Sequence, residues 1–366
     1  MRKLVFLLMS IFVFFCCQPK AEQYEFVMKV EISGIKYGKA YLTRLNEKDR
    51  LCEAEIEGGR FQLKGVFDEA GQYVLHVNRR AFAFFMDGDE MKITCPYTEL
   101  KNIYLKGSPA NDLEIEYGKL MDSGIYQKRS ELLNEYQIAL NDGDEKRSDE
   151  IMTQVLKLGD KSYKLTKEFI QKHPENIFSA YIANVVKEDS YERGSELYDL
   201  LANDIKESFF GMQLKKNVDA LAVSALGGKC PDFQVKDEDG NIVTLNSLKG
   251  QILILDFWAS WCGPCRQEMK NLRRQYDEFK DRGVQIMSVS LDDSIEKWKQ
   301  ACEEEQIPWI STHDENGWKN SEIRKLFGIQ SIPFIVLLDK DGNIVAKNIR
   351  RNLLRDKVLE LLNKNE

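Results

Sequence analysis

The sequence has few histidines and only one Cys-x-x-Cys pair, and these shortages limit the metal chemistry that it can support. Only 3 of its 366 residues are His. The pair Cys262 and Cys265 would supply half of a zinc site, and zinc needs two further ligands. Haem attachment needs His directly after the second Cys, where Arg266 stands. We therefore expect no metal and no cofactor.

Charge of one sign is not concentrated anywhere along the chain. The formal net charge is -7, and Lys and Arg are spread among Asp and Glu. A nucleic-acid-binding protein would carry a basic cluster, so no nucleic-acid partner is expected. The length predicts two or three domains with ample core.

Long apolar runs are absent after the first residues. Positions 4–15 are almost purely apolar and follow Arg2 and Lys3. This run is too short for an ordinary transmembrane helix and is typical of a secretory signal peptide. It ends at Cys16 and Cys17, which resembles a lipoprotein signal, although two Phe precede Cys16 where small residues are usual. Lipidation of Cys16 or Cys17, cleavage without a lipid, and an uncleaved anchor all stay open. We expect the protein to be exported.

Residues 22–107 are predicted to form a small antiparallel β-sandwich. Short segments with β-forming residues recur between turn signals, and Gly58-Gly59 joins two of them as a hairpin. The expected strands cover residues 25–32, 40–43, 54–56, 60–64, 73–77 and 91–94.

Residues 108–225 are predicted to be a helical connector. Apolar residues recur at helical spacing from Ile151 to Phe169, and His173-Pro174 ends this stripe. Three more helices are expected at about 177–187, 191–201 and 203–215.

The last segment, residues 226–366, predicts an α/β domain with a mixed central sheet. The continuous apolar run 252–255 is typical of a buried parallel strand. Further strands are expected at 284–289 and 332–338, and a turn at Asp341-Gly342 predicts a closing hairpin. Helices are expected after Cys262, at 294–305 and at 353–362. Residues 1–17 then remain as the signal segment.

Cys262 and Cys265 have the spacing and setting of a redox dithiol. Thiol–disulfide exchange needs a thiolate, which a free Cys rarely provides at neutral pH. A helix N-terminus favours the thiolate through its unpaired N–H groups and its dipole, and Pro264 suits the first helical turn. The two-residue spacing allows both sulfurs to bond within one turn. We assign Cys262 as the nucleophile and Cys265 as the resolving thiol.

The stretch Leu255-Asp256-Phe257-Trp258-Ala259-Ser260-Trp261-Cys262-Gly263-Pro264-Cys265 resembles the thioredoxin active site. Residues 227–366 as a whole resemble the TlpA/ResA-type thioredoxins of bacterial envelopes. The entry Pro231-Asp232-Phe233 and the turn Asp239-Gly240-Asn241 are similar to that family's opening, which usually has a small residue in place of Cys230. The β region and helices resemble, more loosely, the accessory region of such proteins from Bacteroides.

The resemblance implies roles for two carboxylates. The residue that matches Asp256 is buried beneath the disulfide in thioredoxins and helps to move the proton of the resolving thiol. The residue that matches Glu268 lies near the active site in ResA-like proteins and tunes the thiols. A solvent-facing strand-end Asp256 and a surface Glu268 are the alternatives. Burial would raise either pKa and make the group a usable proton carrier.

The resemblance also implies a substrate-binding edge. It predicts a cis-proline at Pro333 beside the active-site Cys, with Ile332 presenting its backbone to a substrate peptide as an added strand. Trp261 would flank the site as an exposed aromatic, next to Gly263 and Pro264. Trp258 is expected in the core.

These features predict an envelope thiol–disulfide oxidoreductase, more specifically a reductase, on the periplasmic side and lipid-anchored. Its expected partners are disulfide-containing envelope proteins and a membrane electron donor of the DsbD/CcdA kind, and family analogy suggests apocytochrome thiols or misoxidised proteins as substrates. A thiol peroxidase is one alternative, although it would need Thr where Ala259 stands. A partner-binding scaffold with an incidental dithiol is another.

The remaining cysteines are too widely spaced for a dense disulfide framework. Cys52, Cys95, Cys230 and Cys302 are expected to be mostly buried free thiols, with a Cys52–Cys95 bridge left open.

Overall fold

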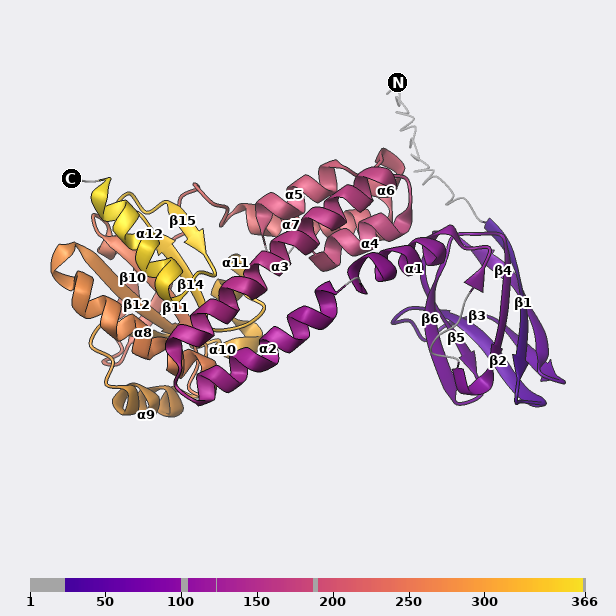
Figure 1. Ribbon diagram of the computed structural model, residues 1–366, viewed down its shortest axis with the longest axis horizontal. Helices are drawn as coiled ribbons and strands as arrows, with labels where there is room; N and C mark the ends of the chain where they lie inside the picture. Colours follow the sequence, from indigo (N-terminus) through magenta and orange to yellow (C-terminus); the bar gives the residue numbers. More distant parts are fainter. Residues whose placement is uncertain (1–23, 100–104, 123, 187–189, 365–366) are drawn as a thin grey trace, which may run out of the picture. The chain divides into compact units, whose positions relative to one another are not determined.

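The computed structural model describes residues 24–99, 105–122, 124–186 and 190–364 (Figure 1). Within them the chain forms two compact units, which divide between Ser108 and Pro109. The predicted signal segment, with Cys16 and Cys17, lies outside the described residues.

The first unit is β-rich, as predicted, but its strands form one sheet instead of the two layers of a sandwich. The order is β6-β5-β2-β3-β4-β1-β7-β8. Its strands are β1 (Tyr24–Ser33), β2 (Tyr37–Arg44), β3 (Arg50–Glu57), β4 (Arg60–Phe67), β5 (Gly71–Val77), β6 (Arg80–Met86), β7 (Glu90–Pro96) and β8 (Leu105–Lys106).

Two details of this sheet differ from the prediction. Strands β1 and β7 pair in parallel, because the chain returns to β1 after five intervening strands and not through a hairpin. Strand β6 was missed: Ala and Phe alternate in it, without the polar residues that mark a half-buried strand. The cluster of buried side chains in this unit draws on every strand from β1 to β8, which gives the sheet a single core.

The second unit begins with helices. They are α1 (Pro109–Asp122), α2 (Ile125–Asn141), α3 (Glu145–Lys172), α4 (Ile177–Val186), α5 (Tyr191–Asp199), α6 (Asn203–Glu207) and α7 (Phe209–Ala222). Helices α2 and α3 form a long hairpin whose connecting end lies against the C-terminal domain (Figure 1).

The predicted helix at 203–215 is wrong, because the chain breaks at Ser208. This residue has extended backbone, with φ -67° and ψ 163°, and its hydroxyl accepts a hydrogen bond from the Gly211 N–H. Serine favours such a cap over a helix interior. Two helices, α6 and α7, therefore replace one.

The C-terminal domain contains the predicted mixed sheet, in the order β10-β9-β13-β12-β11-β14-β15. Its strands are β9 (Gln234–Asp237), β10 (Ile242–Thr244), β11 (Ile252–Trp258), β12 (Val284–Ser290), β13 (Ile310–His313), β14 (Phe334–Leu338) and β15 (Ile344–Lys347). Its helices are α8 (Gly263–Phe279), α9 (Ile295–Glu305), α10 (Gly317–Asn320), α11 (Glu322–Leu326) and α12 (Arg351–Asn363).

The central strand β11 is buried on both faces, as its apolar run predicts. Leu253, Leu255 and Phe257 pack in the cluster that includes α11. Ile252 and Ile254 pack on the other face, in the cluster that includes α8 and α12. Strand β11 pairs in parallel with β12 and antiparallel with β14, which makes the sheet mixed. Strand β13 was not predicted, because its Ser311, Thr312 and His313 are polar although buried.

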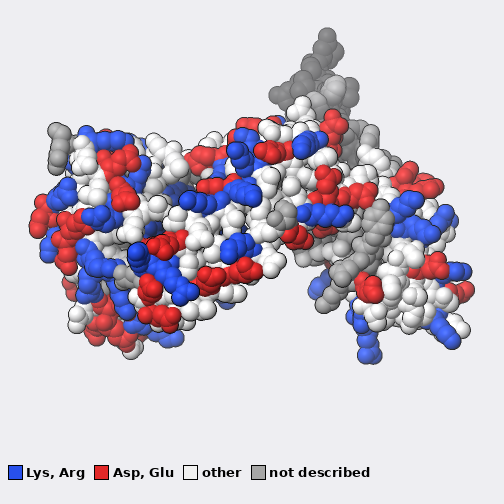
Figure 2. Space-filling view, in the orientation of Figure 1, with Lys and Arg blue, Asp and Glu red and all other residues white. Residues whose placement is uncertain are grey.

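Lys and Arg side chains are interspersed with Asp and Glu over the face of the molecule in view (Figure 2). None of the helices in the described ranges is long and apolar enough to cross a membrane.

Candidate functional site

The redox dithiol lies where β11 passes into α8. Cys262 and Cys265 form a disulfide with an S–S distance of 2.08 Å and a Cα–Cα distance of 5.2 Å. Cys262 is the N-cap of α8, and Pro264 occupies the first helical turn. The Cys265 N–H donates to the Cys262 sulfur at 3.2 Å. This N–H and the helix dipole would stabilise a thiolate at Cys262.

The two cysteines differ in access. Cys262 is 5% exposed and Cys265 is 1% exposed, so Cys262 is the sulfur that a partner reaches first. Trp261 beside it is 57% exposed. Its ring meets that of Trp318 in a T-shaped contact, with centroids 5.9 Å apart. Sequence reasoning missed Trp318, which comes from the short helix α10. Trp258 is fully buried, as expected.

The predicted docking edge lies next to Cys262. The Ile332–Pro333 peptide bond is cis. The carbonyl oxygen of Ile332 lies 3.7 Å from the Cys262 sulfur, directly before β14. A peptide that paired with this backbone would therefore pass over Cys262.

Asp256 is buried inside the sheet, 1% exposed. It pairs with Ser288 across β11 and β12, and the Ser288 hydroxyl donates to its carboxylate at 2.9 Å. Burial raises the pKa of Asp256 to about 7, the charge of Glu268 adds to this rise, and the Ser288 hydrogen bond and Arg350 oppose it. A carboxyl group with this pKa can take up and release a proton near neutrality.

Glu268 lies on α8, one turn beyond Cys265, and is 3% exposed. Its carboxylate accepts from the Asn271 side chain at 3.2 Å and from the Arg351 N–H at 3.1 Å. Burial raises its pKa, while these two hydrogen bonds and the charges of Arg350 and Arg351 oppose the rise. Glu268 therefore lies one helical turn from Cys265 and close enough to Asp256 for its charge to raise the pKa of that group.

The loop before Cys262 is held by a residue that sequence reasoning did not identify. The buried carboxylate of Asp292 accepts from the Ser260 N–H, the Ser260 hydroxyl and the Ser290 hydroxyl. Asp292 follows β12, the parallel neighbour of β11, so both loops leave the same edge of the sheet. The expected adjacency of these two strands was the signal in the sequence from which Asp292 could have been identified.

The other cysteines in the described residues are free thiols, and the Cys52–Cys95 bridge is not formed. Burial raises the pKa of Cys52 to about 11 and the pKa of Cys230 and of Cys302 to about 12. These thiols stay protonated at neutral pH and are poor nucleophiles. No group of side chains in the described ranges is arranged to hold a metal ion.

Comparison with known proteins shows which families this chain is similar to. The AhpC/TSA family matches residues 226–347. The thiol-disulfide oxidoreductase ResA of Oceanobacillus iheyensis is 35% identical over 123 residues, which cover 32% of this chain and 62% of that protein. The ResA of Bacillus thuringiensis subsp. konkukian is 30% identical over 139 residues, which cover 38% of this chain and 78% of that protein.

The chain belongs to the ResA family of thiol-disulfide oxidoreductases. The predicted resemblance and enzyme class are thus confirmed for the C-terminal domain. The β-rich unit matches a domain of unknown function, DUF4369, over residues 26–114.

Solved structures are similar over the same C-terminal region. The thioredoxin domain of a thiol-disulfide oxidoreductase from Bacteroides vulgatus is 34% identical with a TM-score of 0.36, covering 38% of this chain and 98% of that one. A thiol-disulfide oxidoreductase from Bacteroides fragilis is 30% identical with a TM-score of 0.35, covering 36% of this chain and 98% of that one.

Proposed function

We propose that this ResA-family protein reduces disulfide bonds of exported proteins through Cys262 and Cys265. The observation that carries this proposal is the disulfide at the N-terminus of α8, with Cys262 facing the Ile332 carbonyl and Cys265 facing inward. An accessible nucleophile beside a buried resolving thiol is the arrangement that two-step exchange requires.

In the first step the reduced Cys262 thiolate attacks one sulfur of a substrate disulfide. A mixed disulfide forms between Cys262 and that sulfur, and the second substrate sulfur leaves as a thiolate. The N–H of Cys265 and the dipole of α8 favour the attacking thiolate.

In the second step Cys265 attacks the Cys262 sulfur of the mixed disulfide. Cys265 first loses its proton, which we assign to the Asp256 carboxylate, with Glu268 as a second carrier. The first substrate sulfur leaves, and the Cys262–Cys265 disulfide forms. Two electrons have then passed to the substrate, whose two sulfurs take up protons as thiols.

Substrate recognition would use the backbone of Ile332 before cis-Pro333. An extended peptide would add to this edge as a strand and place its disulfide over Cys262. The exposed ring of Trp261 and the turn at Gly263 and Pro264 would border that peptide.

The cycle needs two electrons for each turnover. A membrane donor of the DsbD/CcdA kind would return them to Cys262–Cys265, with the protein on the periplasmic side of the envelope. A lipid on Cys16 or Cys17 would hold it at the membrane. Apocytochromes and misoxidised envelope proteins are the substrate classes that we propose.

Reduction of insulin disulfides by dithiothreitol, followed as insulin precipitation, tests the proposal. The wild-type chain should accelerate the reaction, and Cys262→Ser should abolish the acceleration. Retained activity in Cys262→Ser would refute the assignment. Peroxide consumption by the wild type would favour a peroxidase, and a stable partner complex formed equally well by a Cys262→Ser/Cys265→Ser double variant would favour a scaffold.

A further inference from the structure

Arg351 contacts Glu268 with both its backbone and its side chain. Its N–H donates to one carboxylate oxygen at 3.1 Å, and its Nε lies 3.7 Å from the other. Arg351 is the first residue of α12 and has a φ of 53°. This left-handed conformation is unfavourable for a residue with a side chain, and here it directs the N–H to Glu268.

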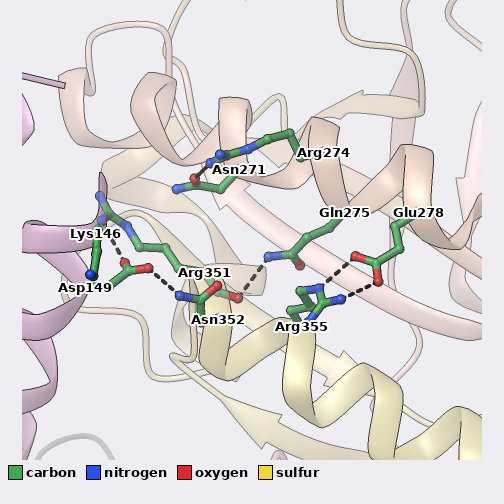
Figure 3. Close-up of a pocket in the computed structure, with 9 residues that line it drawn as sticks. All are labelled: Lys146, Asp149, Asn271, Arg274, Gln275, Glu278, Arg351, Asn352 and Arg355. Carbon is green, nitrogen blue, oxygen red and sulfur yellow. Dashed lines mark hydrogen bonds and ion pairs between the residues drawn. The ribbon is translucent and has the colours of Figure 1, made fainter. Parts of the chain in front are cut away.

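The guanidinium of Arg351 is bound by the α2–α3 hairpin. Its terminal nitrogen donates to Asp149 at 2.8 Å and to the Ser148 hydroxyl. The group also lies over the ring of Tyr136, 5.6 Å from its centroid. The side chains of Arg351 and Asn352 both point to Asp149, which comes from α3 (Figure 3).

These contacts lie at the buried side of the redox site. Arg351 is 9% exposed and Glu268 is 3% exposed. A charged group in such surroundings is costly unless it is paired, and Arg351 is close to two carboxylates at once. A pocket of about 380 Å³ borders the contact, lined by Lys146, Asp149, Asn271 and Arg351 among others (Figure 3).

We propose that Arg351 is a positioning residue that fixes Glu268 beneath the dithiol, and that the α2–α3 hairpin anchors Arg351 for this purpose. The helical region then contributes to the redox function of the C-terminal domain. This inference rests on the proposed function, since it assigns Glu268 a part in proton transfer.

The charged and titratable groups that face Glu268 come from three elements. Asp256 lies on β11, Arg350 and Arg351 lie at the start of α12, and Tyr136 lies on α2. Asp149 on α3 is linked to Glu268 through its ion pair with Arg351. The charges of Arg350 and Arg351 favour the ionised carboxylate, against its burial. Without the Arg351 guanidinium, Glu268 should hold its proton to higher pH.

Arg351→Gly removes the guanidinium and keeps the N–H, because Gly adopts a positive φ without strain. A Ser148→Ala/Asp149→Ala double variant keeps the Arg351 residue but removes the two side chains of α3 that hold its guanidinium. The matched controls are Arg355→Ala, on the same helix but paired with Glu278, and Lys146→Ala, on the same turn of α3. Each is made in the full chain.

Difference infrared titration of the Glu268 carboxyl band, assigned by its loss in Glu268→Gln, is the primary measurement. An opposite charge at this distance shifts a pKa by about one unit, so the midpoint should rise by about one pH unit in Arg351→Gly. It should rise in the Ser148→Ala/Asp149→Ala variant as well, and stay at the wild-type value in both controls. The mixed-disulfide resolution rate at pH 7 should fall several-fold in the first two variants.

In a Glu268→Gln background, Arg351→Gly should cause no further loss of rate. A wild-type midpoint in Arg351→Gly or in the double variant would overturn the proposal, and so would an equal rise in Arg355→Ala. The infrared midpoint does not depend on catalysis, so it separates failure of this inference from failure of insulin reduction by the wild type.

Discussion

The N–H and the hydroxyl of Ser260 both donate to the buried carboxylate of Asp292, at 2.8 and 2.6 Å. The loop that carries Trp261 and Cys262 is thereby tied to the end of the neighbouring strand. Asp292→Ala should release this loop and leave three donors, two on Ser260 and the Ser290 hydroxyl, without their acceptor. The expected cost is about 1–3 kcal/mol in stability.

The Asp292→Ala variant should also lose about tenfold in kcat/KM for insulin reduction, because the nucleophile is less well placed. Asp292→Asn keeps an acceptor oxygen and should recover part of both losses. Thermal unfolding and insulin kinetics check this. Wild-type values for Asp292→Ala would mean that the loop holds its shape without the carboxylate.

Asp256 should make the folded protein less stable as the pH rises from about 4 to about 7. Its pKa is raised to about 7 by burial, so the unfolded chain loses this proton before the folded protein does. A rise of about three units from the ordinary value of about 3.9 corresponds to at most about 4 kcal/mol, fully lost above pH 7.

Asp256→Asn has no proton to lose, and the unfolding free energies of the two proteins should therefore match near pH 4. At pH 8 the variant should be the more stable one, by several kcal/mol. Urea unfolding of the oxidised protein at both pH values measures the difference. If the difference in unfolding free energy between the two proteins is the same at pH 4 and pH 8, a raised pKa at Asp256 would be contradicted.

The same substitution should slow the second chemical step selectively. Without the Asp256 carboxylate, Cys265 has lost its proton acceptor, and proton transfer of this kind contributes about 10²-fold or more. Quenched-flow experiments should show mixed disulfide accumulating in Asp256→Asn, while attack by Cys262 keeps its rate. Equal slowing of both steps would argue for a general structural effect.

Cys265→Ser should hold substrates as stable mixed disulfides on Cys262, because the resolving thiol is gone. Capture in cells followed by mass spectrometry should identify exported proteins with paired cysteines. Cys262→Ser/Cys265→Ser is the control, and proteins captured by it as well are not redox substrates. Cytoplasmic proteins alone in the specific set would argue against an envelope location.

Local patterns predicted much of this fold. The apolar run of β11, the Pro264 signal of α8 and the Gly58-Gly59 hairpin each depend on neighbouring residues, and the structure has all three elements. Strands β6 and β13 were missed because their burial comes from distant partners and not from their own alternation. The same limit explains why the parallel pairing of β1 with β7 was not predicted, since the local sequence does not indicate which distant strands pair.

The residues of the site divide in the same way, into those identified from local sequence and those that depend on distant contacts. Cys262, Cys265 and Asp256 were identified by motif and spacing, and Asp256 and Glu268 do lie in the interior. Ser288, Asp292 and Arg351 were not identified, because each acts through a contact between elements 32 to 203 residues apart. Such contacts are decided by strand register and packing.

The contact of Arg351 with Asp149 also bears on how the protein can be divided for study. A fragment that starts at residue 226 would retain the dithiol, Asp256 and Glu268, yet it would lack Tyr136, Ser148 and Asp149. Its Arg351 guanidinium would be hydrated by water instead of being held by α3. Reduction potentials and rates measured on that fragment would then differ from those of the intact chain. A fragment that starts at residue 109 would retain Tyr136, Ser148 and Asp149.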